Sequence, residues 1–265
     1  MSESGGTGSV MAQLEKWAIE DARIAPDHFA CLHYKACNVS VGEELQGGEG
    51  CCMSYVGPKY GEGFRLAIVG MDHGYFDSAT FEGRRDGIQD CYVNKQKKFN
   101  QHYAGVVKTA AAILGKSGDH CREHCLQSCH ATKPETCVID RISQPNLVKC
   151  TPHTQNDRTS RSSWVMKGNC ARHLLAELRI LRPNVTVFHG IESRSIMRLE
   201  FERAGVDLFA IEECADTSGP ALYRSAELGA HFLFLYHPSH GWLARQWKLV
   251  EKWIGYLRER GLVPE

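Results

Sequence analysis

The chain lacks the features that would place it in a membrane or on an export route. None of its hydrophobic runs approaches the roughly 18 to 20 residues that cross a bilayer. Residues 1–11 are rich in Ser and Gly and carry no apolar signal core. Lys+Arg and Asp+Glu both total 31, and this balance excludes a globally polybasic coat but not a local basic groove. These absences predict a cytoplasmic protein.

Composition and length indicate one globular domain. The chain has 265 residues, of which 43% are hydrophobic and 23% charged, so it can bury a sizeable core. Single α/β domains often exceed 200 residues, and the sequence shows neither an internal repeat nor a linker. We therefore expect a flexible tail over residues 1–12 and a single domain over residues 13–265.

Cysteine is abundant, with twelve residues in the chain. A long chain without an export signal is expected to keep these thiols reduced, so one metal or iron–sulfur site is a better explanation than disulfides. Most of the twelve are expected to be ordinary packed thiols. Residues 117–138 form a Cys/His-rich insertion with Cys121, Cys125, Cys129 and Cys137. These cysteines are candidate zinc ligands, although the spacing of the cysteines matches no standard zinc site.

Short apolar runs alternate with amphipathic stretches along the chain. The expected strands cover residues 64–70, a segment ending at 146–150, 185–190 and 231–236. The expected helices cover residues 11–25, 103–114 and 167–181, and a C-terminal helix carries Leu243, Trp247, Val250, Ile254 and Leu257. This alternation predicts the α/β class, as a three-layer αβα sandwich around a mostly parallel four-stranded sheet.

The ligand site of such a sheet lies outside the carboxyl ends of its strands. The segments that emerge there are the loop after Gly70, the stretch around Asn146, and the loops after Gly190 and Tyr236. Asp72 follows the first strand and has two interpretations, a carboxylate that positions water or a cap of a turn. His237 follows the last strand, where it is either a hydrogen-bond donor to an anion or a structural histidine.

Taken in order, these segments resemble the motifs of the uracil-DNA glycosylase superfamily. The matching elements are Gly70-Met71-Asp72-His73-Gly74, Asn146-Leu147-Val148-Lys149-Cys150, Gly190 after a Val-rich strand, and His237-Pro238-Ser239. The Asn-x-Val-Lys-Cys element and the later Cys170-x-x-His-Leu-Leu are characteristic of the iron–sulfur branch, usually called family four. The resemblance spans roughly residues 64–255.

The resemblance implies a separate role for each of three residues in the site. Asp72 is the carboxylate that positions the attacking water and stabilises a cationic sugar, and His237 donates to the developing uracil anion. Asp72 occupies the position where the best-known branch has an Asp. The iron–sulfur branch has its acidic residue one position earlier, where this chain has Met71. Asn146 matches the O4 and N3–H edge of uracil, with a loop Asn bonded to backbone as the alternative.

The base pocket implied by the resemblance includes Gly70, Met71 and Gly74. Tyr103 lies in a segment that resembles the family's Phe-Val-Gly element, and so is the expected stacking residue, with Tyr75, Phe76 and Phe99 as rivals. The best-known branch has a Tyr that blocks the thymine methyl, and this chain has Gly74 at that position. We therefore expect hypoxanthine or xanthine to be accepted beside uracil. The sequence leaves open whether His73, His102 or His240 joins the site.

Further residues are expected to contact the DNA. By resemblance, Ser239 binds a phosphate, and Trp242 or Leu243 wedges into the space left by a flipped base. Arg245, Lys149 and the cluster at residues 95–98 are candidates for backbone contacts. A solvated loop is the alternative for the lysines.

The resemblance also implies a [4Fe–4S] cluster. Cys150 and Cys170 align with two cluster ligands of the iron–sulfur branch. The Cys-x-x-Cys pair expected before the first strand is absent, and Cys31 with Cys37 is the preferred replacement. Cys51 and Cys52 are the other cysteines of that region.

The expected function is therefore base-excision repair of DNA by a monomeric glycosylase. Its substrate would be single- or double-stranded DNA with uracil or another deaminated base, and neither a membrane nor a protein partner is implied. Two alternatives come from other classes: a protein that binds lesions without turnover, and a metal- or redox-handling protein dominated by the Cys/His insertion.

Overall fold

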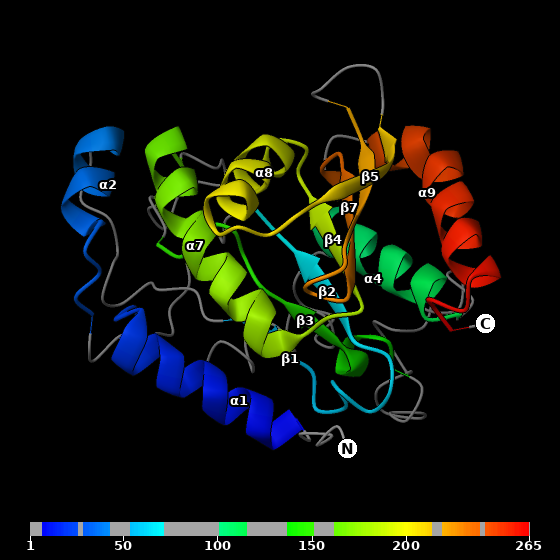
Figure 1. The fold of residues 1–265 in the computed structure, drawn as a ribbon, viewed down its shortest axis with the longest axis horizontal. Coiled ribbons are helices and arrows are strands. Elements are labelled where there is room, and N and C mark those ends of the chain that lie inside the picture. Colours follow the sequence, from blue (N-terminus) through cyan, green and yellow to red (C-terminus); the bar gives the residue numbers. More distant parts are fainter. Residues whose placement is uncertain are drawn as a thin grey trace.

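The computed structural model describes most of the α/β unit (Figure 1). The described residues are 7–25, 29–42, 54–71, 101–115, 137–150, 162–213, 219–238 and 242–264, with side chains for all of these except Gln101 and residues 242–245. The helices are α1 (Thr7–Lys16), η1 (Trp17–Asp21), α2 (Tyr34–Val41), α4 (Gln101–Ile113), η4 (Ile139–Arg141), α7 (Trp164–Leu181), α8 (Ser193–Arg203) and α9 (Trp242–Glu259). The strands are β1 (Tyr55–Val56), β2 (Leu66–Val69), β3 (Ile142–Gln144), β4 (Val185–His189), β5 (Phe209–Glu213), β6 (Ala221–Ser225) and β7 (Ala230–Leu235).

The strands form one mixed seven-stranded sheet in the order β1-β3-β2-β4-β7-β6-β5. The central strands β3, β2, β4 and β7 are parallel, whereas β1, β6 and β5 join through antiparallel pairs. The α/β class and the parallel centre are thus confirmed, but the expected number of four strands is wrong. The added strands are weak in sequence, because β1 has two residues and β5 is an exposed edge that ends in two glutamates.

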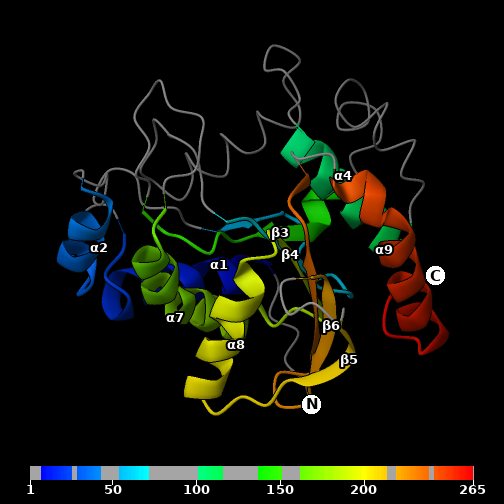
Figure 2. The ribbon, with the colours of Figure 1, turned by 90° about the horizontal axis from the view of Figure 1, so that it is seen from above.

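Helices cover both faces of the sheet, and each face has its own core (Figure 2). In β2, Leu66 and Ile68 pack toward α4 and α9, while Ala67 and Val69 pack toward α7 and α8. Because both faces are covered, β2, β4 and β7 are buried at every position, and their sequences are mostly apolar.

The amphipathic helices pack as their sequence periodicity predicts. Leu174, Leu175, Leu178 and Leu181 of α7 are all buried. In α9, Val250, Ile254 and Leu257 are buried in the core that also contains β2 and β4, and Trp247 packs against it. Apolar residues at steps of three and four therefore turn one face of each helix to the sheet.

Two element boundaries differ from the sequence-based expectation. Helix α1 begins at Thr7, so residues 7–12 belong to a helix and not to the expected flexible tail. Strand β3 ends at Gln144, before the 146–150 segment that was expected to close it. Its pairing with β2 resumes for one residue at an isolated parallel bridge between Gly70 and Asn146.

The connections between the parallel strands create a switch point between β2 and β4. The chain crosses from β2 to β3 through α4 on one face, and then from β3 past β2 to β4 through α7 on the other face (Figure 2). Crossovers that leave in opposite directions open a crevice at the carboxyl ends of the strands, where ligands bind in α/β sheets. Gly70 and Gly190 directly follow the two strands that flank this crevice.

None of the helices in the described part of the chain is both long and apolar enough to cross a membrane.

Candidate functional site

The segment around Asn146 is joined to the end of β2 by backbone hydrogen bonds. The Gly70 amide donates to the Pro145 carbonyl at 3.0 Å, and the Leu147 amide donates to the Gly70 carbonyl at 2.9 Å. The Val148 amide then donates to the Met71 carbonyl at 2.9 Å. This ladder extends the β2–β3 pairing beyond both strands, so residues 145–148 lie at the carboxyl edge of the sheet.

Asn146 lies directly against Gly70. A Cβ atom added at Gly70 would come within 2.4 Å of Asn146 Oδ1, closer than real atoms approach, and within 3.7 Å of His102 Cε1. Asn146 is 8% exposed. The missing side chain at Gly70 is therefore what admits the amide of Asn146 beside the imidazole of His102.

Gly190, on the other side of the switch point, likewise leaves room for a neighbouring side chain. Its φ is +140°, a conformation that favours glycine, and an added Cβ would lie 2.4 Å from Met71 Cγ. The Met71 side chain thus crosses over the backbone that follows β4. Gly70, Met71 and Gly190, all singled out from the sequence, meet at the switch point.

Three imidazoles come together at the same edge. The rings of His102 and His237 are stacked, with centroids 5.2 Å apart and planes 9° from parallel. The ring of His189 meets His102 edge-on at 6.2 Å and 87°. They come from the first turn of α4, the end of β4 and the segment after β7, so the fold brings His237 to the neighbourhood of Gly70 and Asn146 through His102.

His189 is the buried member of this imidazole cluster (His102, His189 and His237). Its side chain is fully buried, and its Nε2 lies 3.3 Å from the Thr109 hydroxyl of α4. Burial lowers the pKa of His189 well below its ordinary value, and the nearby His102 and His237 lower it further. A neutral imidazole with a hydrogen-bonded hydroxyl is a fixed support rather than a group that titrates near neutral pH.

Several expected site residues lie outside the described part of the chain. These are Asp72, Gly74 and Ser239, together with the side chains of Trp242, Leu243 and Arg245 and the four-cysteine insertion up to Cys129. Tyr103 is described, and it packs against the core between the sheet and the α4 and α9 helices. The ring that contacts His237 is that of His102, one residue earlier.

Lys149 is a correction to the sequence-based expectation. It was expected to contact DNA backbone, but its side chain is 1% exposed and pairs with the fully buried carboxylate of Glu177. Ser54 donates to the other Glu177 oxygen at 2.9 Å. Burial raises the pKa of Glu177, and the Lys149 ammonium and the Ser54 hydroxyl oppose that shift. Lys149 is therefore an interior ion-pair residue whose ammonium does not reach a phosphate.

The four cysteines expected to hold a cluster share one region of the protein. Cys37, Cys150 and Cys170 are buried in the same core, and Cys31 lies beside them. Burial raises the pKa of Cys31, Cys37 and Cys170, and the proximity of Cys150 adds to the rise in each case. Segments far apart in sequence thus place these four thiols within electrostatic reach of one another.

Polar side chains surround this cysteine group (Cys31, Cys37, Cys150 and Cys170). Asn169 donates to the Cys37 sulfur at 3.6 Å, and His173 Nε2 lies 4.0 Å from the Cys31 sulfur. Burial lowers the pKa of His173 to about 4, and the positive charge of Lys149 adds to the shift. His173 is therefore neutral at pH 7 and can share a hydrogen bond with a thiolate.

The described residues contain no ready-made site for a single metal ion. Within the described ranges, no three His, Cys, Asp or Glu side chains lie as the ligands of one metal ion. The described cysteines form no disulfide. All four side chains of the cysteine group are thiols, and thiolates are the usual protein ligands of iron–sulfur clusters. Cys137, from the insertion, is buried in the core on the opposite face of the sheet.

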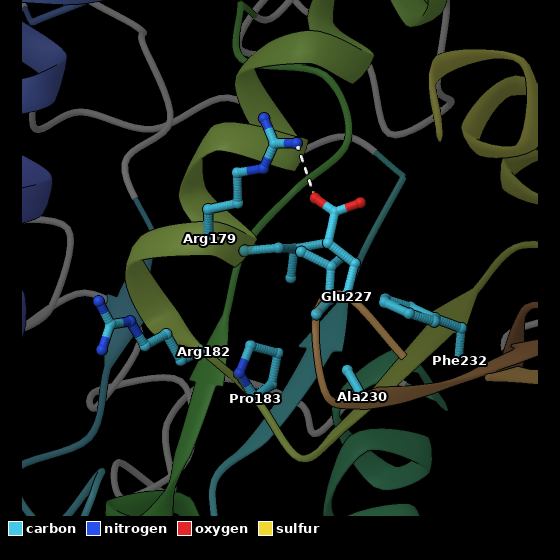
Figure 3. A pocket seen from close by; sticks show the side chains of 8 residues that line it. Arg179, Arg182, Pro183, Glu227, Ala230 and Phe232 are labelled. Carbon is cyan, nitrogen blue, oxygen red and sulfur yellow. Dashed lines mark hydrogen bonds and ion pairs between the residues drawn. The ribbon is translucent and has the colours of Figure 1, made fainter. Parts of the chain in front are cut away.

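A shallow cavity of about 210 Å³ lies away from this site (Figure 3). It is lined by the end of α7 and the beginning of β7, including Arg182 and Phe232. Arg179 and Glu227 form an exposed ion pair of 3.5 Å at its rim. Because the carboxyl end of β7 is at Leu235, this cavity opens at the opposite edge of the parallel strands from the imidazole cluster.

No family model matches the chain, and a search of curated proteins found no similar sequence.

Sequence reasoning missed the side chains that support the site. His189 closes a Val-rich strand, but an imidazole at that position resembles an ordinary strand end. Glu177 lies on the buried face of α7 between leucines, and that pattern was its one signal. Their partners Thr109 and Lys149 are distant in sequence, so only the fold brings each pair together.

The buried ion pair generates a stability prediction. Lys149→Met should lower the free energy of unfolding by about 3–5 kcal/mol, because Glu177 would keep an uncompensated charge in the core. The measurement is denaturant unfolding, and Lys149→Met with Glu177→Leu should recover much of the loss. Lys248→Met, on the exposed side of α9, is the matched control. Weakened DNA binding with unchanged stability would restore the original expectation for Lys149.

The close contact at Gly70 generates a second prediction. Gly70→Ala should displace the Asn146 amide, because an added Cβ would lie 2.4 Å from Asn146 Oδ1, and the side-chain amide signals of Asn146 in an NMR spectrum should shift. The obstructing atom is the end of a side chain, so the melting temperature should change little. Gly168→Ala, on α7 where an added Cβ meets nothing within 4 Å, is the control. Unshifted Asn146 signals in Gly70→Ala would contradict the contact.

Proposed function

We propose that this protein hydrolyses the N-glycosidic bond between deoxyribose and uracil, or a similarly deaminated base, in DNA. One observation carries the proposal. Asn146 and His237, the two residues that the resemblance assigns to the base, are brought toward one place, with Asn146 against Gly70 and His237 stacked on His102. That place is the switch point of the parallel sheet, where ligands bind in this class of fold.

The substrate base must leave the helix before these residues can reach it. A nucleotide inside a duplex is inaccessible, and flipping it into a pocket costs a few kcal/mol. The Asn146 amide has both a donor and an acceptor, which complement O4 and N3–H of uracil. Cytosine presents the opposite pattern on this edge, so the same amide discriminates against the undamaged base.

The reaction breaks the bond between N1 of uracil and C1′ of the sugar. The bonding electrons remain on the base, and His237 stabilises the negative charge that develops on its oxygen by donating a hydrogen bond. Water forms the new bond to C1′ and loses its proton, for which Asp72 is the acceptor. Asp72 directly follows Met71, whose carbonyl is held by the Val148 amide. The products are the free base and an abasic site.

We further propose that Cys31, Cys37, Cys150 and Cys170 hold a [4Fe–4S] cluster. The proximity of all four to one another, the burial of Cys37, Cys150 and Cys170, and the all-thiol donor set support it. When bound, the cluster supplies a structural cross-link between the α2 region, the segment after β3 and α7. Because Cys150 follows the Asn146 segment directly, this cross-link would hold the base-reading loop at the sheet edge.

The proposed activity is tested with oligonucleotides that each carry one uracil, hypoxanthine or xanthine. The parent protein should give abasic product from uracil, and Gly74 leads us to expect product from the purines as well. His237→Ala should lower the single-turnover rate by roughly 10²- to 10³-fold, because it removes one donor to the anion. Asp72→Asn should lower it by roughly 10²- to 10⁴-fold.

Full-rate cleavage by both variants would contradict the mechanism. Binding to the damaged strand without abasic product from any base would favour the lesion-binding alternative, with residues 70–74 as a binding loop.

The cluster is tested by metal analysis of protein purified without oxygen. The parent should contain about four irons per chain and show the visible absorbance of an iron–sulfur cluster. Cys150→Ser and Cys170→Ser should each lose the iron and lower the melting temperature. Cys137→Ala is the matched control, because Cys137 is buried on the opposite face of the sheet and should not change the iron content. Zinc in place of iron, or iron unaffected by Cys150→Ser, would contradict the assignment.

A further inference from the structure

We propose that His102 is a positioning residue that acts through His237: its ring holds the imidazole of His237 in the orientation that meets the leaving base. The inference rests on the proposed glycosylase function and adds a residue to its machinery. The resemblance assigns no role to a histidine at this position.

The direct observation is the stack between the two rings. The His102 and His237 planes are 9° from parallel with centroids 5.2 Å apart. His102 lies in the first turn of α4, and its Cε1 is 3.7 Å from the point where a Gly70 Cβ would be. It therefore lies between Gly70, which bears the Asn146 contact, and the histidine after β7.

His237 benefits from such a contact because of where it lies in the chain. It is the second residue after β7 and is only partly buried, so the core does not enclose its ring. An imidazole has two side-chain torsions, and a donor aimed at a developing charge acts only if both are set before the reaction. A flat ring against one face restricts them, and offset-stacked rings are an arrangement that aromatic pairs favour.

The His102 ring is itself held from beneath. His189 meets it edge-on at 6.2 Å and 87°, the geometry that aromatic pairs favour. His189 is fully buried at the end of β4. Its Nε2 lies 3.3 Å from the hydroxyl of Thr109, which is two turns beyond His102 on the same face of α4. The order of support therefore runs from Thr109 to His189, then to His102 and finally to His237.

The experiment compares two substitutions of similar size at His102. His102→Phe keeps a flat ring and should cleave uracil-containing DNA in single turnover at a rate within about threefold of the parent. His102→Leu fills the space without a ring, and its rate should fall roughly 10- to 100-fold, as expected for a misaligned catalytic group. Affinity for a non-cleavable 2′-fluoro-deoxyuridine duplex should be unchanged in both variants.

A double substitution separates action through His237 from direct action. In the His237→Ala background, His102→Leu should cause no further loss, because the residue it positions is already gone. Lys108→Arg is the matched control on α4, since it keeps a cation over the Trp247 ring and should leave the rate at that of the parent. Melting temperatures of all variants identify any that fail to fold.

Three results would overturn the inference while leaving the glycosylase function standing. One is an unchanged rate in His102→Leu, and another is an equal loss in His102→Phe and His102→Leu. The third is weaker binding of the non-cleavable duplex by His102→Leu, which would make His102 a residue that contacts the base itself. Absence of cleavage by the parent protein would instead contradict the proposed function.

Discussion

The backbone ladder between residues 70–71 and 145–148 is the constraint on which the candidate site depends. Three hydrogen bonds of 2.9 to 3.0 Å continue the β2–β3 pairing past the ends of both strands. Without them the Asn146 segment would be a free loop and its amide would have no fixed position. A side chain at residue 70 would collide with the Asn146 amide, and the glycine there leaves room for it.

The same ladder ties the pocket to the interior. Two residues beyond its last bond, Cys150 joins the cysteine group, and between them Lys149 pairs with Glu177 inside the protein. An interior ion pair is costly to desolvate and expensive to break, so it fixes the position of its segment more than it adds to stability. The imidazole cluster is supported in a similar way, because the ring of the buried, neutral His189 packs edge-on against His102. The Lys149–Glu177 ion pair and His189 are thus buried residues that hold the segments carrying Asn146 and His102 in position.

The sequence predicts β2, β4 and β7 of the parallel centre because these strands are buried on both faces and mostly apolar, and glycines follow β2 and β4. It also identifies Gly70, Asn146, Gly190 and His237, since residues at the carboxyl ends of parallel strands must lie at one edge. It does not reveal β5, whose two glutamates belong to an exposed edge, or the pairing of Lys149. A lysine beside a cysteine resembles a surface residue until α7 places Glu177 against it, and such partners depend on tertiary structure alone.

We propose that this edge of the sheet releases a deaminated base from DNA. Mass spectrometry can detect the free bases released from long, chemically deaminated DNA after incubation with the unmodified protein. Free uracil should appear in the supernatant, with hypoxanthine or xanthine beside it, and no thymine or cytosine. Release of nucleotides in place of bases, or of nothing at all, would contradict the proposed activity.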